Sequence, residues 1–182
     1  MYRFDDVRLR RFRKEDIPKK IAWINNPLNN RYLHYDLPLE EEKTLLWYDK
    51  NKERNDRYDA IIEYHGAPVG LIGLLNIDRK NKKAEEYITI GEQEAKGKGI
   101  ATKAGILLSA YAFLEVKLNK VYCYIETGNE PSLRLFAKRG FSVEGILRDD
   151  LCMNGRFVDR KVLALFAHQY LIPSDAYWEN VE

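Results

Sequence analysis

The sequence predicts a mixed α/β fold with helices and strands in the order βααβββαβαββ. Two kinds of period predict it, because apolar residues recur at helical spacing in some segments and alternate with polar residues in others. Turn residues separate these segments. With 182 residues, of which 45% are hydrophobic, the chain can fill one core, and it contains no repeat or linker. We therefore expect a single domain over residues 1–182.

The first quarter of the chain predicts one strand and two helices. Val7–Phe12 alternates apolar and basic residues, which indicates a half-buried strand. Regularly spaced isoleucines predict a helix over 17–24, which Pro27 ends. An irregular aromatic segment follows over 28–38. The next helix is expected over 40–52, because glutamates in its first turn suit the positive end of a helix dipole.

An antiparallel meander of three strands is predicted in the middle of the chain. The strands cover 58–64, 68–77 and 84–91, and polar turns separate them. A glycine-rich loop over 96–99 then leads into a helix over 100–116, whose apolar residues follow helical spacing closely. The change of period places this loop between a strand and a helix.

The last third of the chain predicts a strand, a helix and two further strands. The strand over 121–126 is rich in β-branched and aromatic residues. A proline opens and a glycine closes the short helix over 131–140. Strands are expected over 141–147 and 156–170, joined at Asn154-Gly155, a dipeptide that favours hairpin turns.

The overall charge gives no reason to expect a nucleic-acid partner. The chain has 30 basic and 28 acidic residues, so its formal net charge is only +2. No apolar run is long enough to span a membrane, and the N-terminus lacks a secretory pattern, so we expect a cytoplasmic protein without a membrane partner. Cys123 and Cys152 are expected to be reduced. No metal-ligand spacing is present, so no metal is expected.

The glycine-rich loop has the properties of a phosphate-binding site. A helix N-terminus carries unpaired N–H groups and a partial positive charge. Glycines let a phosphate approach those N–H groups, and nearby lysines add charge. The alternative is a flexible basic turn. The loop and the first helical turn consist of Lys96, Gly97, Lys98, Gly99, Ile100, Ala101 and Thr102.

A second motif follows about thirty residues later, over 129–141. It fits the pattern N-x-x-A/S-x-x-L/F-Y/F-x-K-x-G-F, and the glycine-rich loop approximates Q/R-x-x-G-x-G/A with Lys96 in its first position. Together, in a strand–loop–helix–strand context, the two motifs resemble those of the GNAT superfamily of N-acetyltransferases. The whole chain is similar to the branch that holds ribosomal-protein and spermidine N-acetyltransferases. The resemblance implies the GNAT acyl-CoA N-acyltransferase fold, with a splayed central strand pair.

The resemblance also implies acetyl-CoA as cosubstrate and direct acetyl transfer to an amine. The molecule is expected in a V-shaped opening between the strands over 84–91 and 121–126. Its pyrophosphate would meet the N–H groups from about 96 to 101, and its pantetheine arm would pair with the backbone near 88–90, like an added strand. The remaining expected contacts are Ile88, Thr89, Ile90, Asn129, Ser132 and Lys138.

The reaction needs a base, because a protonated amine has no lone pair to attack with. Glu86 is the predicted base, since the family often carries a glutamate at this position. Glu126, at the end of the neighbouring strand, is the alternative. In an extended strand Glu86 shares a face with Ile88, whereas Glu85 points to the opposite face.

The general acid is the point at which the sequence departs from the family pattern. Many relatives have a tyrosine where this chain has Phe136, which cannot donate a proton. Ser132 and Tyr124 are the predicted substitutes, and Tyr122 is a further candidate. The thiolate can also leave unaided, because a thiol pKa near 8.5 makes it a fair leaving group.

The segment between the first two helices is expected to shape the acceptor site. Its candidate residues are Tyr32, His34, Tyr35 and Glu41. Acidic groups suit a polyamine, and aromatic rings suit an amino sugar or nucleotide amino sugar. A protein N-terminus as acceptor, and a non-catalytic acetyl-CoA-binding module, are the alternatives. A homo-oligomer is possible on the resemblance alone.

Overall fold

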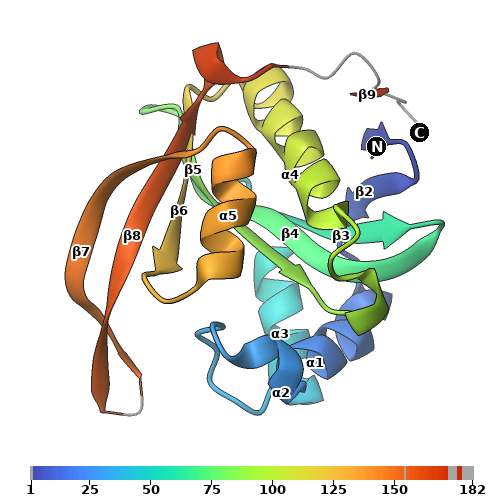
Figure 1. The fold of residues 1–182 in the computed structure, drawn as a ribbon. Coiled ribbons are helices and arrows are strands. Elements are labelled where there is room, and N and C mark those ends of the chain that lie inside the picture. Colours follow the sequence, from blue (N-terminus) through green and yellow to red (C-terminus); the bar gives the residue numbers. More distant parts are fainter. Residues whose placement is uncertain (1, 154, 172–175, 178–182) are drawn as a thin grey trace.

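The computed structural model describes residues 2–153, 155–171 and 176–177 (Figure 1). Nine strands form one mixed sheet in the order β7-β8-β6-β5-β4-β3-β2-β1-β9. All neighbours are antiparallel except β5 and β6. The strands are β1 (Tyr2–Phe4), β2 (Val7–Arg11), β3 (Tyr58–Tyr64), β4 (Ala67–Asp78), β5 (Lys83–Ile90), β6 (Lys120–Glu126), β7 (Ser142–Met153), β8 (Arg156–Phe166) and β9 (Ala176–Tyr177).

Helices pack on both faces of the sheet. They are α1 (Ile17–Asn25), α2 (Pro27–Asn30), α3 (Glu41–Asn51), α4 (Ile100–Ala110) and α5 (Glu130–Lys138). Short 3₁₀ segments cover Lys14–Asp16, Gln93–Ala95 and Ala167–Gln169. In the described part of the chain, no helix is both long and apolar enough to cross a bilayer.

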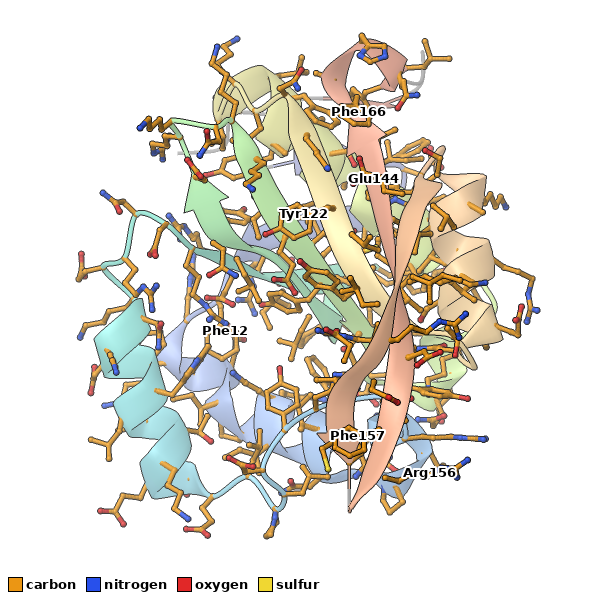
Figure 2. The ribbon with its side chains drawn as sticks, turned by 90° about the vertical axis from the view of Figure 1, so that its left-hand side faces the viewer. Phe12, Tyr122, Glu144, Arg156, Phe157 and Phe166 are labelled. Atoms are coloured by element: carbon orange, nitrogen blue, oxygen red, sulfur yellow. The ribbon has the colours of Figure 1, made fainter. Side chains whose placement is uncertain are left out.

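Two clusters of buried side chains hold these layers together. The larger cluster joins the sheet to α4 and α5, and includes Ile72, Leu107 and Phe136. The smaller cluster joins the opposite face to α1 and α3, and includes Phe12 and Trp23. Figure 2 shows Phe12 between the sheet and these two helices. Each face of the central strands is therefore covered by its own helices.

The predicted meander is confirmed in its order and pairing, whereas several element boundaries differ from the predictions. The helix expected over 100–116 ends at Ala110 and continues as a π-helical turn, Tyr111–Glu115, in which the Val116 N–H donates to the Tyr111 carbonyl. This wider turn rotates Leu114 outward, so that it is 38% exposed. The last strand ends at Phe166 instead of Tyr170.

Three short elements were not predicted, because a hydrophobic period cannot be recognised in so few residues. They are β1, β9 and α2, and α2 lies in the segment expected to be irregular. In the predicted Asn154-Gly155 turn, Gly155 has a φ of +75°. Asn154 lies outside the described residues.

Lys20, on α1, is an unusual member of the smaller cluster. It is only 6% exposed, and its Nζ lies 3.0 Å from the centroid of the Trp47 ring. Burial lowers the pKa of Lys20 to about 7; the charge of Arg57 acts in the same direction, and that of Asp59 opposes it. A lysine in the unfolded chain keeps its proton to a pH above 10. Between about pH 7 and 10 the unfolded chain therefore binds one more proton, and folding stability should rise with pH.

We expect Lys20→Met to stabilise the protein by about 2 kcal/mol at pH 7, since it removes the cost of burying an amine and forfeits a cation–π contact. The advantage should shrink steadily toward pH 10, where the wild-type amine is neutral in the fold. Urea unfolding at a series of pH values measures both effects. Lys50→Met, at an exposed position of α3, is the control. A stability difference between Lys20→Met and wild type that stayed constant with pH would contradict the prediction.

Candidate active site

The central parallel strands separate after a short stretch of pairing. β5 and β6 pair only at Lys83–Lys120, Ala84–Val121 and Glu85–Tyr122. Beyond that rung β5 still pairs with β4, and β6 with β8, as far as Ile90 and Glu126. The two strands diverge in Figure 1, with α5 in front of the opening. The predicted splayed strand pair is therefore confirmed, and residues 86–90 have one backbone edge without a strand partner.

The glycine-rich loop forms the N-terminus of α4, at the end of the opening. Gly97 and Gly99 both have a φ of +76°, which favours glycine over residues with a side chain. Nothing lies within 4 Å of a Cβ built at either position. Ile100 begins the helix with its side chain buried, and Ala101 and Thr102 lie half-buried in the first turn. The N–H groups of this turn are thus open to an anion.

The lysines around this loop differ in what they contact. Lys96 Nζ donates to Asn29 Oδ1 at 2.7 Å and to the Leu28 carbonyl at 3.2 Å, so it ties the loop to α2. Lys103 forms ion pairs with Asp5 and Asp6, which neutralise it. Lys98 and Lys138 are exposed, and Lys98 lies 6.0 Å from the Tyr64 ring centroid. Lys98 is therefore the loop lysine most available to a phosphate.

The second motif forms the loop before α5 and the helix itself. Asn129 Oδ1 accepts a hydrogen bond from the backbone N–H of Ser132 at 3.3 Å, which caps α5. Phe136 is 3% exposed and packs edge-on against Phe141, with ring centroids 5.0 Å apart. The position that carries tyrosine in many relatives is therefore part of the core here.

The structure contradicts the prediction that Glu86 is the base. Its carboxylate forms a bidentate ion pair with Arg139, with N–O distances of 2.5 and 2.9 Å. The two side chains are 0% and 1% exposed. The pair lies on the face covered by α4, because Arg139 also donates to the Gly105 carbonyl and to Ser109. An amine cannot reach a carboxylate that is buried and already paired.

The opposite face of β5 and β6 carries a different carboxylate at the start of the opening. Glu85 is half-buried there and accepts a hydrogen bond from Asn76 Nδ2 at 3.2 Å. Burial raises the pKa of Glu85, while Asn76 and the charge of Arg160 oppose the change. A raised carboxyl pKa moves toward the range in which a general base works best. The sequence analysis placed Glu85 and Glu86 on opposite faces, but it could not show which face was open.

Tyr122, Tyr124 and Glu126 lie on the same face as Glu85, because residues two apart on a strand point the same way. Figure 2 shows Tyr122 in the middle of this face. The Tyr122 and Tyr124 rings meet edge-on, with centroids 5.6 Å apart. Arg160 lies 4.6 Å from the Tyr124 ring centroid and pairs with Asp150. Tyr124 and Ser132, the two predicted proton donors, therefore lie on different sides of the opening.

The segment after α2 reaches across this face to β6. His34 Nε2 lies 2.7 Å from Glu126 Oε1, and the Tyr32 hydroxyl donates to the Gly128 carbonyl at 3.0 Å. Two predicted acceptor residues are thus brought to the end of β6. Glu41, the fourth candidate, is exposed in the first turn of α3, as expected of a residue placed by the helix dipole.

Tyr35 marks the other side of the same face. Burial raises the pKa of the Tyr35 hydroxyl; the charge of Arg57 opposes this change and that of Asp59 adds to it. Asp59 accepts hydrogen bonds from Arg57 and, at 2.5 Å, from the buried hydroxyl of Tyr87 on β5. The sequence alone did not predict this network, because its members come from segments far apart in the chain. In the described residues, no group of three or more His, Cys, Asp or Glu side chains could hold a metal ion.

Gly99→Val should weaken CoA binding at least tenfold, because a side chain would obstruct the α4 N-terminus and resist the left-handed backbone. Isothermal titration calorimetry with CoA measures this. Gly155→Val is the control, since Gly155 has nearly the same φ and equally open surroundings at the far end of the β7–β8 hairpin. An equal loss of CoA affinity in both variants would indicate general backbone strain and would contradict a phosphate-binding site at Gly99.

Comparison with known proteins finds acetyltransferases. A family model described as an acetyltransferase (GNAT) domain matches residues 6–142. Spermidine N(1)-acetyltransferase of Escherichia coli (strain K12) is 33% identical over 166 residues, covering 91% of this chain and 88% of the relative. The putative ribosomal N-acetyltransferase YdaF of Bacillus subtilis (strain 168) is 38% identical over 112 residues, covering 62% of this chain and 61% of the relative.

A solved structure agrees with the fold. Spermidine N-acetyltransferase from Vibrio cholerae in complex with CoA and spermine superimposes with a TM-score of 0.84 at 25% identity. The match covers 91% of this chain and 98% of that chain. The similarity therefore extends over almost the whole length of both proteins.

Proposed function

The chain belongs to the GNAT family of acetyl-CoA-dependent N-acetyltransferases, and from this premise we propose that its acceptor is a linear polyamine. The observation that carries the proposal is the charge of the face on which Glu85 and Glu126 lie. Arg160 is offset by Asp150, and Arg57 by Asp59. Among the described residues, Glu85 and Glu126 form no ion pair with an arginine or a lysine, and Glu126 instead contacts His34.

The spacing of these carboxylates favours an extended polycation. Glu85 is level with Tyr122, and Glu126 lies four residues further along β6. At about 3.3 Å per residue, the two carboxylates are separated by roughly 13 Å along the strand direction. A compact monoamine can contact only one of them. Arg160 already lies over the Tyr124 ring, which leaves the Tyr122 ring between the carboxylates to attract an ammonium group.

We assign the role of general base to Glu85. It would take the proton of the acceptor ammonium, after which the amine nitrogen forms a bond to the acetyl carbonyl carbon and the carbon–sulfur bond breaks. The backbone edge of β5 at Ile88–Ile90 and the N–H groups of the first α4 turn would hold acetyl-CoA. Asn129, Ser132, Lys98 and Lys138 border the same opening. Because phenylalanine has no proton to donate, we propose that the thiolate leaves without a proton from position 136.

Release of free thiol from acetyl-CoA tests the acceptor. Spermidine and spermine should turn over, and propylamine, which has the same reactive group but a single charge, should show a KM at least tenfold higher. Glu126→Gln should raise the KM for spermidine about tenfold and leave that for propylamine unchanged, since charged contacts contribute about 1.5–3 kcal/mol. Turnover of an amino sugar or a ribosomal-protein peptide instead would refute the polyamine assignment. Binding of acetyl-CoA without turnover on any amine would refute the enzyme's assigned acceptor class as well.

A further inference from the structure

The Glu86–Arg139 pair lies where β5 and β6 begin to separate. Glu85–Tyr122 is the last paired rung, so Glu86 and Cys123 are the first residues beyond it. Both face α4 and α5, and burial together with the charge of Glu86 raises the pKa of the Cys123 thiol, while Arg139 opposes the change. The guanidinium group is therefore close to both diverging strands.

Arg139 connects the three elements that border the opening. It follows α5 directly, pairs with β5 through Glu86, and donates to Gly105 and Ser109 on α4 at 2.8 and 3.0 Å. Its Cζ also lies 5.1 Å from the ring centroids of both Phe136 and Phe141. A charged group held from this many sides has little freedom to move.

A glycine within α4, Gly105, leaves the space that the Arg139 guanidinium group occupies. A Cβ built at Gly105 would lie 2.1 Å from Arg139 Cζ, so no other residue fits without displacing the guanidinium group. Glycine inside a helix costs about 1 kcal/mol relative to alanine. Replacing a buried ion pair by apolar residues is often neutral or stabilising, so this pair is poorly explained by stability alone.

We propose that Glu86 and Arg139 are positioning residues that set the separation of β5 and β6, and thereby the width of the site for the pantetheine arm of acetyl-CoA. The inference rests on the proposed place of acetyl-CoA along β5, and it does not depend on which amine is the acceptor. The pair ties β5 at Glu86 to the C-terminal end of α5 and, through Gly105 and Ser109, to the second half of α4, away from Gly99 at the start of that helix. A change in the length of the Glu86–Arg139 contact should therefore alter the contacts of the pantetheine arm. It should spare the binding of the pyrophosphate by the glycine-rich loop.

The test compares two ligands on the double variant Glu86→Met/Arg139→Met, which keeps the volume and removes both charges. CoA contains the pantetheine arm, and 3′-phosphoadenosine 5′-diphosphate ends at the pyrophosphate. By calorimetry, CoA affinity should fall at least tenfold, whereas affinity for the shorter ligand should stay within twofold of wild type. Glu130→Met/Arg134→Met, which removes an exposed pair on the same helix, is the matched control.

Unchanged CoA affinity in the folded double variant would overturn the proposal, as would an equal loss for both ligands, which would indicate general loosening. If the double variant does not fold, Glu86→Asp serves instead, because it keeps the charges and shortens the contact by one methylene. Glu86→Asp should lower the affinity for CoA at least threefold and leave the affinity for the shorter ligand unchanged. The absence of this difference between the two ligands would overturn the proposal. A wild-type protein that binds neither ligand would instead refute the proposed place of acetyl-CoA, and the positioning role with it.

Discussion

Arg139→Met is expected to lower the free energy of unfolding by about 3–5 kcal/mol, the largest effect on stability that we predict. The variant leaves the Glu86 carboxylate buried without its partner, at a side-chain exposure of 0%. Removing one member of a buried pair costs far more than removing both, since the remaining charge keeps its desolvation penalty. Urea unfolding at pH 7 measures the change.

Arg134→Met provides the comparison for this prediction. Arg134 is 71% exposed and lies 3.8 Å from Glu130 on the same helix, so its loss should change stability by less than about 1 kcal/mol. The double variant Glu86→Met/Arg139→Met should recover most of the stability lost in Arg139→Met. A loss below about 1 kcal/mol in Arg139→Met would mean that the pair is not buried as described.

Glu85→Gln is expected to lower kcat about a hundredfold with spermidine, while acetyl-CoA affinity stays near that of wild type. The amide is nearly isosteric with the carboxylate but cannot accept the ammonium proton, and a positioned base contributes roughly 10²–10⁴-fold. Steady-state thiol release, together with calorimetry for CoA, separates the two quantities. Glu115→Gln, at an exposed position after α4, is the control.

The pH dependence gives a second measure of the same residue. The base must be ionised to accept a proton, so kcat/KM should fall as pH drops through the raised pKa of Glu85. Glu85→Gln should lose this acidic limb of the profile. If the limb persisted unchanged in the variant and kcat were preserved, Glu126, the other carboxylate on this face, would be the next residue to test.

Local patterns in the sequence were enough to predict the fold and the cradle. The meander over 58–91 follows from alternating residues and turns, and both motifs consist of residues close together in the chain. The positive φ angles of Gly97 and Gly99 agree with what a loop at a helix N-terminus requires. Such features depend on the backbone and on neighbours within a few residues.

The choice of Glu85 as the proposed base depended on the tertiary structure. Glu85 and Glu86 are equivalent by composition and period, and the period shows only that they point to opposite faces. Arg139 distinguishes the two glutamates, because it pairs with Glu86 alone although it lies 53 residues later in the sequence. The space for its guanidinium group depends on the absence of a side chain at Gly105. The sequence by itself thus determined an acetyltransferase fold, and it predicted the glycine-rich loop at the start of α4. Only the packing of α4 and α5 on one face decided that Glu86 is buried and that Glu85, on the other face, is half-buried, since burial is set by residues distant in the chain.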